Sequence, residues 1–368
     1  MKLKRVELAW RRMWIAILVR LMRASHGERP DWDARPHRVL FLRHDRAGDM
    51  ILSTGVMRAI ARSHATIALD VLASPANAGI LDGASYVHEV VNFDKRRLKH
   101  YLATILRLRR ARYDAVIDCM VTAPSLTTLL LVWASGARYR IGIAGRGNDA
   151  AFNVTVRPEI RSHAHMVDHL AALVPAFGVD TARADVRPML EETVDDRRRA
   201  AEAWERAAAG REGSGPRVLI NLSAGTRARL WPDENYVAVI DHLRRREPRA
   251  RFIVIAAPNE MNRGEHVAAA AGATLVRTPR LRDALGIVAT ADFVFTPDTS
   301  IAHAAAAFDR PCVAMYVAGS VTRWGLYPAS PRARSVEHPE PTLTTLGVDR
   351  MVVAVDEVWD AAVVSRVG

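Results

Sequence analysis

The sequence predicts two successive α/β domains, each built on a parallel sheet with helices on both faces. Short apolar runs alternate with helix-patterned stretches from residue 38 onward, and the alternation restarts after a Gly- and Ser-containing segment at 210–216. With 368 residues, 49% of them hydrophobic, the chain can form two cores. We therefore expect an N-terminal extension over residues 1–37, a first domain over 38–209 and a second over 210–368.

In the first domain, five apolar runs predict strands, and helical periodicity fills the stretches between them. The expected strands are 38–43, 67–73, 87–92, 113–119 and 138–143, and the expected helices are 50–63, 75–82, 95–111 and 124–135. Residues 162–209 are predicted to be mostly helical, with an interruption near 178–188.

The second domain shows the same alternation, which predicts a second doubly wound sheet. The expected strands are 217–222, 251–257, 292–296 and 311–317, and the expected helices lie near 232–246, 260–271, 280–290 and 300–308. Two such domains in succession predict a cleft between them.

The charge is strongly positive and unevenly distributed. The net charge is +12; the part before Arg217 holds 34 Lys and Arg against 24 Asp and Glu, and the rest holds 18 against 16. A positive excess suggests acidic partners such as nucleic acid, anionic lipid or phosphorylated ligands. Because we find no basic motif interleaved with aromatic residues, nucleic acid is not an expected partner.

The first 24 residues hold seven Lys or Arg, one Glu and two Trp. Their apolar run, residues 13–19, is too short to span a bilayer and lacks a small-residue cleavage site, which argues against a transmembrane helix and a signal peptide. A basic helix with Trp on its apolar side suits the surface of an anionic membrane. A helix packed on the domain explains the pattern equally well.

The two cysteines, Cys119 and Cys312, lie in separate apolar runs and form no metal-binding or disulfide pattern. We expect them to be buried free thiols in a reducing cytosol.

Ligands of open α/β sheets bind at the carboxyl ends of the strands, where three corners of the sequence are of interest. The first is "FLRHDRAGDMILSTGVMRAI" at 41–60. Gly48 is expected to allow a sharp turn, and Asp49 to lie at a helix N-terminus, where the dipole favours the ionised carboxylate. Asp49 could act as a general base or simply cap the helix. The basic loop residues Arg43, His44 and Arg46 favour an anionic ligand.

The second corner is "NLSAGTRARLWPDENY" at 221–236. Small residues that let phosphate oxygens approach the backbone, followed by guanidinium groups and a helix start, could hold a pyrophosphate. The alternative is an ordinary surface loop with Pro in the first helical turn. The candidates are Ser223, Gly225, Thr226 and Arg229.

The third corner is "ADFVFTPDTSIAHAAAAFDRPCVAMY" at 291–316. Free amides at Thr299, Ser300 and Ile301 are expected at the start of an Ala-rich helix, which suits a diphosphate. Asp298 could bind sugar hydroxyls or cap the helix, and His303 could be a packed helical histidine.

Together these segments resemble glycosyltransferase family 9, the bacterial heptosyltransferases of lipopolysaccharide core assembly, over roughly residues 38–330. The likeness rests on the opening strand with its Gly-Asp corner, on "TRARLWP", and on the segment 291–316. It implies the GT-B fold, in which the first Rossmann-like domain holds the acceptor and the second holds the nucleotide sugar.

The resemblance also implies roles for individual residues. Asp49 matches the family's proposed catalytic base, with Arg43, His44, Arg46 and Gly48 around it on the acceptor side. On the donor side, Arg229 matches a phosphate-binding position usually occupied by Lys, Asp298 a carboxylate that contacts the sugar, and Glu260 a possible ribose contact. Thr299 and Ser300 match small residues whose amides meet the diphosphate, although Gly is common at position 300.

The implied activity is an inverting transfer of a sugar, with ADP-heptose as donor substrate and a phosphorylated, lipid-linked glycan as acceptor. We expect no cofactor and no metal, since no DxD motif follows a strand. We also expect a monomer in the cytoplasm, peripheral on the anionic inner membrane. Transfer of a different sugar to another surface glycan, and a non-catalytic nucleotide-sugar-binding or nucleic-acid-binding protein, remain open alternatives.

Overall fold

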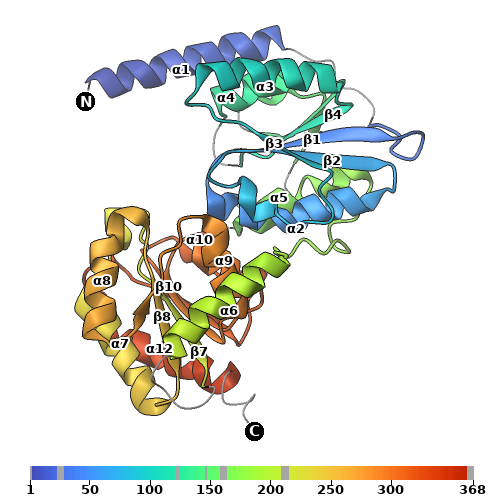
Figure 1. The fold of residues 1–368 in the computed structure, drawn as a ribbon. Coiled ribbons are helices and arrows are strands. Elements are labelled where there is room, and N and C mark those ends of the chain that lie inside the picture. The colour runs from blue at the N-terminus through green and yellow to red at the C-terminus, as the bar shows by residue number, and fades with distance from the viewer. Residues whose placement is uncertain are drawn as a thin grey trace. The chain divides into compact units, whose positions relative to one another are not determined.

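Each half of the chain folds around its own six-stranded parallel sheet (Figure 1). The computed structural model describes residues 2–22, 29–121, 124–145, 147–157, 164–208 and 215–362. The chain divides into two units, Met1–Val186 and Arg187–Gly368.

The first sheet has the strand order β3-β2-β1-β4-β5-β6. The order reverses between β1 and β4, which lie side by side at the centre, so the crevice for a ligand opens beyond their carboxyl ends. The strands are β1 (His37–Arg43), β2 (Ile67–Ala73), β3 (Glu89–Asn92), β4 (Ala115–Asp118), β5 (Tyr139–Ile143) and β6 (Val154–Val156).

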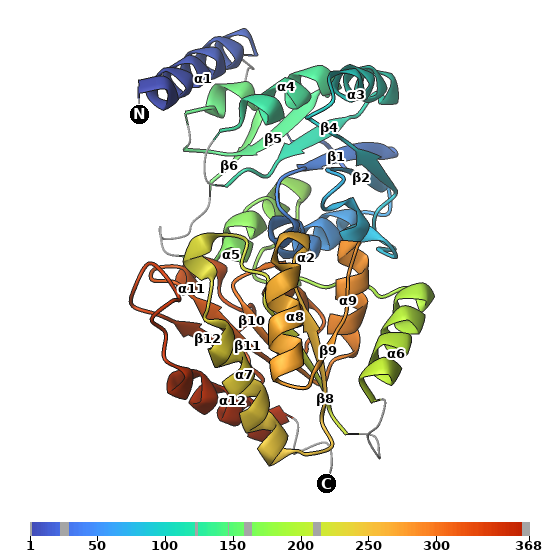
Figure 2. The ribbon, with the colours of Figure 1, turned by 60° about the vertical axis from the view of Figure 1, so that its left-hand side comes forward.

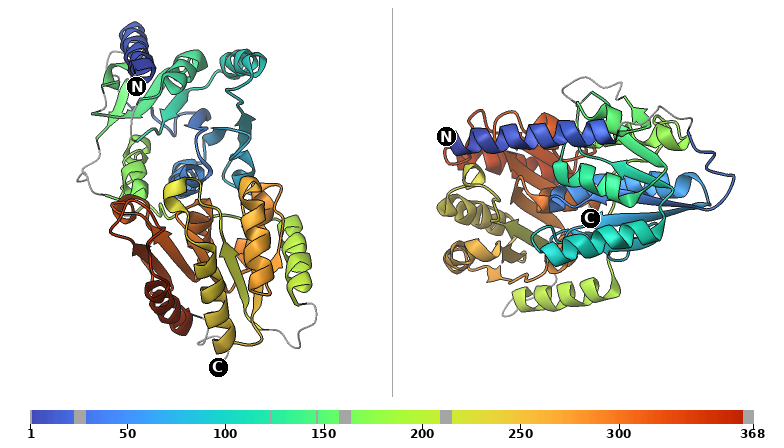
Figure 3. Two further views of the ribbon diagram at one scale, coloured as in Figure 1. Left: turned by 90° about the vertical axis from the view of Figure 1, so that its left-hand side faces the viewer. Right: turned by 90° about the horizontal axis from the view of Figure 1, so that it is seen from above.

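Helices cover both faces of this sheet (Figures 1 and 3). Three of them, with Leu40, Leu42 and Val116 of the central strands, form one hydrophobic cluster on one face. These are α1 (Lys2–Leu21), α3 (Leu98–Ala111) and α4 (Leu126–Ser135). The other face is covered by α2 (Ala47–Ser63) and α5 (Met166–Ala171), and short 3-10 turns lie at η1 (Ala78–Leu81), η2 (Asp149–Ala151) and η3 (Val174–Phe177).

The second sheet, β12-β11-β10-β7-β8-β9, has the same connectivity, with the reversal between β7 and β10. Its strands are β7 (Arg217–Asn221), β8 (Arg251–Ile255), β9 (Thr274–Leu275), β10 (Phe293–Pro297), β11 (Cys312–Tyr316) and β12 (Ala333–Glu337). The carboxyl ends of β7 and β10 therefore flank the ligand crevice expected of this topology.

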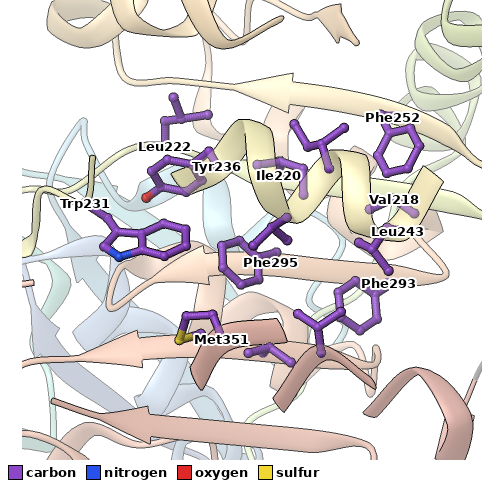
Figure 4. Packing of buried hydrophobic residues seen from close by; sticks show 14 of the residues in the cluster. Val218, Ile220, Leu222, Trp231, Tyr236, Leu243, Phe252, Phe293, Phe295 and Met351 are labelled. Carbon is purple, nitrogen blue, oxygen red and sulfur yellow. The ribbon is translucent and has the colours of Figure 1, made fainter. Parts of the chain in front are cut away.

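One face of the second sheet packs on a large aromatic and aliphatic core (Figure 4). The rings of Trp231, Tyr236 and Phe295 contact one another within it. The helices on this face are α7 (Asp233–Arg246), α8 (Met261–Ala270) and α12 (Val348–Ala362), and those on the other face are α6 (Val194–Ala208), α9 (Leu281–Thr290) and α10 (Ser300–Ala307) (Figure 2). The short η4 (Arg227–Arg229), η5 (Pro258–Glu260) and α11 (Val321–Trp324) lie in the loops after strands.

The structure confirms the fold class and all nine expected strands to within two residues. It adds three sheet-edge strands that the sequence reading missed, β6, β9 and β12. The first two are only three and two residues long, and β12 carries polar side chains along a partly exposed edge. The helix expected over 75–82 is only the 3-10 turn η1, and α12 was not foreseen.

The division between the units lies earlier than the expected boundary at 209/210. That expectation rested on the segment 210–216, of which residues 210–214 lie outside the described part of the chain. Helix α6 precedes that segment and packs on α9, where a Cβ atom at Gly286 would come within 2.9 Å of the Asp196 carbonyl oxygen. The two helices are also joined by a buried ion pair between Asp196 and Arg282, with a separation of 2.6 Å. This packing assigns α6 to the second unit.

Helix α1 has two apolar faces, one packed on the first unit and one exposed; the alternative of packing on the domain is therefore confirmed, and membrane binding stays a prediction. Val19 and Met22 are buried in the cluster of the first unit, and Ile15 and Leu18 pack against it. A second set of large apolar side chains on the same helix is exposed: Trp10, Met13, Trp14, Ile17 and Leu21. Among the described helices, none meets the length and hydropathy needed to cross a bilayer.

Replacing Asp196 with alanine should destabilise the second unit by about 3–5 kcal/mol, because the Arg282 guanidinium would stay buried without its carboxylate. Burial alone would raise the pKa of Asp196, but hydrogen bonds from Arg282 and Thr193 hold it below its usual value. The stabilisation is therefore present above the ordinary carboxyl pKa and is lost as pH falls through the lowered pKa. Urea unfolding followed by circular dichroism measures the effect. The exposed neighbour Asp195→Ala is the control, and equal losses in both variants would contradict this account.

Candidate functional site

The polar residues singled out in the sequence lie where the two strand orders reverse. In the first unit, they follow β1, the central strand next to β4. In the second unit, most of them follow β7 and β10, which pair with each other in parallel, and Glu260 follows β8, which pairs with β7. In each unit the carboxyl end of a central strand thus carries a set of candidate site residues.

Arg43, the last residue of β1, is almost fully buried and is held by its own neighbours. Its Nε donates to Ser53 Oγ at 2.8 Å, and its Nη1 lies 2.9 Å from the Asp45 carboxylate. Burial opposes the charge, but Asp45 and the other acidic groups nearby raise the pKa of Arg43, which stays protonated. The guanidinium therefore places a fixed positive charge beneath the loop.

The neighbouring basic residues differ from each other. His44 is buried, its Nε2 lies 3.3 Å from Thr128 Oγ1, and its ring packs edge-on against Phe93. Burial lowers the pKa of His44, so the ring is neutral near pH 7. Arg46 is exposed and is the N-cap residue of α2. Of the three, only Arg46 offers its charge to the solvent.

Asp49 lies in the first turn of α2, as expected, but the local geometry departs from two expectations. Gly48 is the second residue of the helix and does not have a positive φ, so the chain does not use its conformational freedom for a sharp turn. The N-cap is Arg46 rather than Asp49, which argues against a simple capping role.

Burial is the largest influence on the pKa of Asp49. Burial raises its pKa, Arg43 and Arg46 oppose the rise, Asp45 adds to it, and the result is a pKa of about 6. Burial thus opposes the preference for the ionised form that was expected at a helix N-terminus, and near pH 6 about half of this carboxyl group is protonated. A carboxyl group with this pKa is ionised at neutral pH and is a stronger base than an ordinary aspartate.

Asn221 joins the loops after β7 and β10 in the second unit. Its side chain is fully buried, and its Nδ2 donates to Thr296 Oγ1 at 2.9 Å and to Thr299 Oγ1 at 3.1 Å. Its Oδ1 accepts the Ser223 amide at 3.1 Å. This residue was not among those predicted from the sequence; the signal available was a polar amide that ends an otherwise apolar strand.

Arg229 and Asp298, singled out separately in the sequence, form an ion pair. Arg229 Nη2 lies 2.7 Å from Asp298 Oδ2, and Nη1 donates to the Asp298 carbonyl oxygen at 2.8 Å. Asp298 is buried, whereas a quarter of the Arg229 side chain is exposed. The guanidinium is thus oriented at two points while part of it stays accessible.

Glu260 also contacts the loop after β7. Its Oε2 accepts the Ala224 amide at 3.1 Å, and its Oε1 lies 3.5 Å from Arg263 Nη1. The same loop turns at Gly225, which has a φ of +69°, and a side chain there would meet no atom within 4 Å. Ser223 and Thr226 flank this turn. The backbone of the loop is therefore held by Glu260 on one side and faces open space on the other.

The start of α10 differs in detail from the expected set of three free amides. Thr299 is the N-cap, and its Oγ1 accepts the Ile301 amide at 3.3 Å, so that amide is satisfied. Neither Asp298 nor Ser300 caps the helix. For the amides of Thr299 and Ser300, no acceptor is found within the part of the chain that the structure describes. His303 is buried one turn into the helix.

Taken together, the second unit presents two backbone amides at a helix start, an accessible guanidinium and a glycine turn, all at the switch point of a Rossmann-type sheet. This combination of positive groups suits a diphosphate. The heptosyltransferase model of glycosyltransferase family 9 matches residues 101–349. The chain belongs to glycosyltransferase family 9. The match includes every donor-side candidate and leaves out Asp49.

Solved structures of this family share the fold. The family 9 glycosyltransferase from Veillonella parvula is 15% identical, with a TM-score of 0.79 over 91% of this chain and 100% of that chain. The ADP-heptose lipopolysaccharide heptosyltransferase II of E. coli is 17% identical, with a TM-score of 0.67 over 87% and 98%. E. coli heptosyltransferase WaaC, solved with ADP, is 20% identical, with a TM-score of 0.68 over 87% and 99%. No curated protein matches the sequence. The fold is thus the GT-B fold of heptosyltransferases.

Two further observations concern the chemistry of this glycosyltransferase. Within the described residues, no three His, Cys, Asp or Glu side chains are grouped so that they could hold a metal ion. Cys119 and Cys312 are buried and free, as expected, and burial raises the pKa of both thiols. Neither thiol is available as a nucleophile.

Asn221→Ala should destabilise the second unit by about 1–3 kcal/mol, because the Ser223 amide and the Thr299 hydroxyl lose a buried partner. Hydrogen exchange should also show faster exchange of the Ser223 amide, since the loop after β7 loses its tie to β10. Asn262→Ala, at an exposed position on α8, is the matched control and should change neither the free energy of unfolding nor the exchange rate of the Ser223 amide. Unchanged exchange at Ser223 would show that Asn221 does not organise the loop.

Proposed function

We propose that the protein is an inverting glycosyltransferase that transfers a heptose from an ADP-activated donor to a lipopolysaccharide core or related lipid-linked acceptor. The observation that carries the proposal is the ordered Arg229 guanidinium beside the start of α10 in a family 9 chain. WaaC, a structural neighbour, has been solved with ADP and with an ADP-2-deoxy-2-fluoro heptose, which supports a nucleotide-sugar donor.

On the donor side, Arg229 and the amides of Thr299 and Ser300 would bind the diphosphate. Ser223, Gly225 and Thr226 would let its oxygens approach the backbone of the loop. Asp298 would accept hydrogen bonds from the donor sugar, Glu260 from the ribose, and His303 would support the wall of the site from within α10. These roles follow the family resemblance.

On the acceptor side, Asp49 would act as general base. It would take the proton of an acceptor hydroxyl while that oxygen attacks the anomeric carbon from the face opposite the diphosphate. The new C–O bond forms as the bond to the diphosphate breaks, so the configuration inverts and ADP leaves with its electron pair. The exposed Arg46 would bind acceptor phosphate, and Arg43, His44 and Gly48 would shape the loop that carries it.

Charge stabilisation in this reaction would come from the protein itself. Arg229 and the start of α10 would offset the negative charge that develops on the leaving diphosphate, so we propose that the transfer needs no divalent metal. Since the acceptor is built on lipid, we propose that the enzyme is peripheral on the inner membrane, on its cytoplasmic side. We also propose that it is active as a monomer.

Asp49→Asn should lower kcat about 10²–10⁴-fold, because the amide cannot accept the proton. In the wild-type enzyme, kcat/KM should rise with pH through about 6 and level off above it, because only the ionised carboxylate is active. Initial rates of ADP release across this pH range test both points, with the exposed Asp82→Asn as control. A pH limb near 6 that persists in Asp49→Asn would assign the base to another group.

Arg229→Gln should weaken ADP binding by about tenfold or more, because a charge-assisted contact to phosphate is lost. Arg229→Lys should retain more of the affinity, since it keeps the charge. Titration calorimetry with ADP measures the effect, and Arg227→Gln, an exposed neighbour in the same loop, is the control.

A parallel thermal-shift screen of ADP-heptose, ADP-mannose, UDP and GDP sugars identifies the donor. Preference for a UDP sugar would overturn the donor assignment.

A further inference from the structure

The outer surface of the first unit carries an unusual number of exposed large apolar side chains. Helices α1, α4 and α3 lie side by side on one face of the first sheet, with α4 contacting both of the others (Figure 3). We call their solvent-facing side the three-helix face. Its exposed apolar residues are Trp10, Met13, Trp14, Ile17 and Leu21 on α1, Trp133 on α4, and Leu98, Leu102 and Leu106 on α3.

The leucines of α3 form a stripe of their own. Leu98, Leu102 and Leu106 follow each other at intervals of four residues, so they lie along one side of the helix. Their exposed fractions are 74%, 55% and 55%. The helix is anchored to the sheet from a different side, by Thr104 and the fully buried Leu108. The core does not require these leucines, and the described part of the unit leaves them open to solvent.

The charged residues of the segment that carries the stripe are all basic. Residues 95–113 hold eight Lys or Arg and no Asp or Glu, and the segment of α4 carries no charged residue at all. Lys99 and Arg110, which flank the leucines, have no ion-pair partner among the described residues. Positive side chains beside exposed leucines are what a surface for anionic lipid requires.

A shallow pocket of about 550 Å³ adjoins the stripe at Leu106. Its polar lining includes three guanidinium groups, those of Arg38, Arg107 and Arg110. Glu89 pairs with Arg38 at 2.6 Å and also with Arg107, and the buried Asp70 pairs with Arg38 at 2.8 Å. These two carboxylates offset two of the three guanidinium charges, which leaves Arg110 as the uncompensated charge of the pocket. The pocket could take an anionic headgroup whose acyl chains lie along the leucines.

Aromatic residues complete the face. Trp10 and Trp14 pack edge-to-face on α1, and Arg109 of α3 lies over the ring of Trp133 on α4. Trp is enriched at the boundary between lipid and water, where one part of the ring is apolar and the other is polar. Nucleic acid would satisfy the charges but would leave the leucine stripe in water.

We infer that the three-helix face is a docking surface for the interface of an anionic phospholipid bilayer. The inference rests on the membrane location given under the proposed function and names the surface that would make the contact. That surface is centred on α3 and α4 and is not limited to the N-terminal helix considered from the sequence. The observations that carry it do not depend on the sugar chemistry. The bilayer would be bound by insertion of leucine and tryptophan side chains and by attraction between Lys or Arg and lipid phosphate.

The test is flotation of the full chain with vesicles of phosphatidylcholine alone or mixed with phosphatidylglycerol, with no sugar donor present. The wild-type protein should float with the mixed vesicles and much less with the neutral ones. The variant Lys99→Glu/Arg110→Glu should bind mixed vesicles at least about tenfold more weakly. Leu98→Ser/Leu102→Ser/Leu106→Ser should show a loss of similar size, because the inserted area is removed.

Control variants place changes of the same kind in the second unit. Arg206→Glu/Arg245→Glu alters the net charge equally, and Val194→Ser/Val353→Ser removes exposed apolar side chains; both should bind vesicles like the wild type. Circular dichroism and ADP titration confirm that each variant is folded and report separately on the proposed function. Equal flotation of test and control variants, or equal binding to neutral vesicles, would overturn the inference. So would duplex DNA binding that falls with the charge variant while vesicle binding does not.

Discussion

The burial of both faces of each parallel sheet is the constraint on which the candidate sites depend. Strands such as β7 and β10 are apolar along their length and have no solvent-facing side, so polar groups can enter only at their ends. Polar groups that are buried there must be paired. Asn221 meets this requirement by joining Thr296, Thr299 and Ser223, and in doing so it fixes two loops relative to each other. The same pairing that satisfies the core thus orders the candidate donor site.

The sequence predicted the elements whose pattern is local. Strand β1 and helix α2 follow from an apolar run and a helical period, and the corners that contain Asp49 and Asp298 follow from the strand ends. It could not predict pairings between distant residues. The ion pair of Arg229 with Asp298 joins positions 69 residues apart, and no periodicity reveals that these two side chains meet. The raised pKa of Asp49 also depends on burial by the folded chain, which a residue type does not show.

Helix α1 shows a second limit of pattern reading. Its sequence contains two apolar stripes, and a hydrophobic pattern alone cannot say which of them faces the protein. The structure buries Val19 and Met22 and leaves Trp10 and Trp14 exposed. A helix that needs only one of its apolar faces for packing has another free for a partner. The leucine stripe of α3 follows the same logic, although α3 was predicted only as a helix.

The pairing of Arg229 with Asp298 bears on how the proposed donor site would work. A guanidinium has five N–H donors; in Arg229 one donates to the Asp298 carbonyl oxygen, and Nη2 lies 2.7 Å from the Asp298 carboxylate. Donors therefore remain for a diphosphate, and Asp298 holds the planar group in place before any ligand arrives. A side chain oriented in advance loses less conformational entropy when it binds phosphate. In this view the buried carboxylate fixes the orientation of Arg229, and it stays close to where the donor sugar would be attached to the diphosphate.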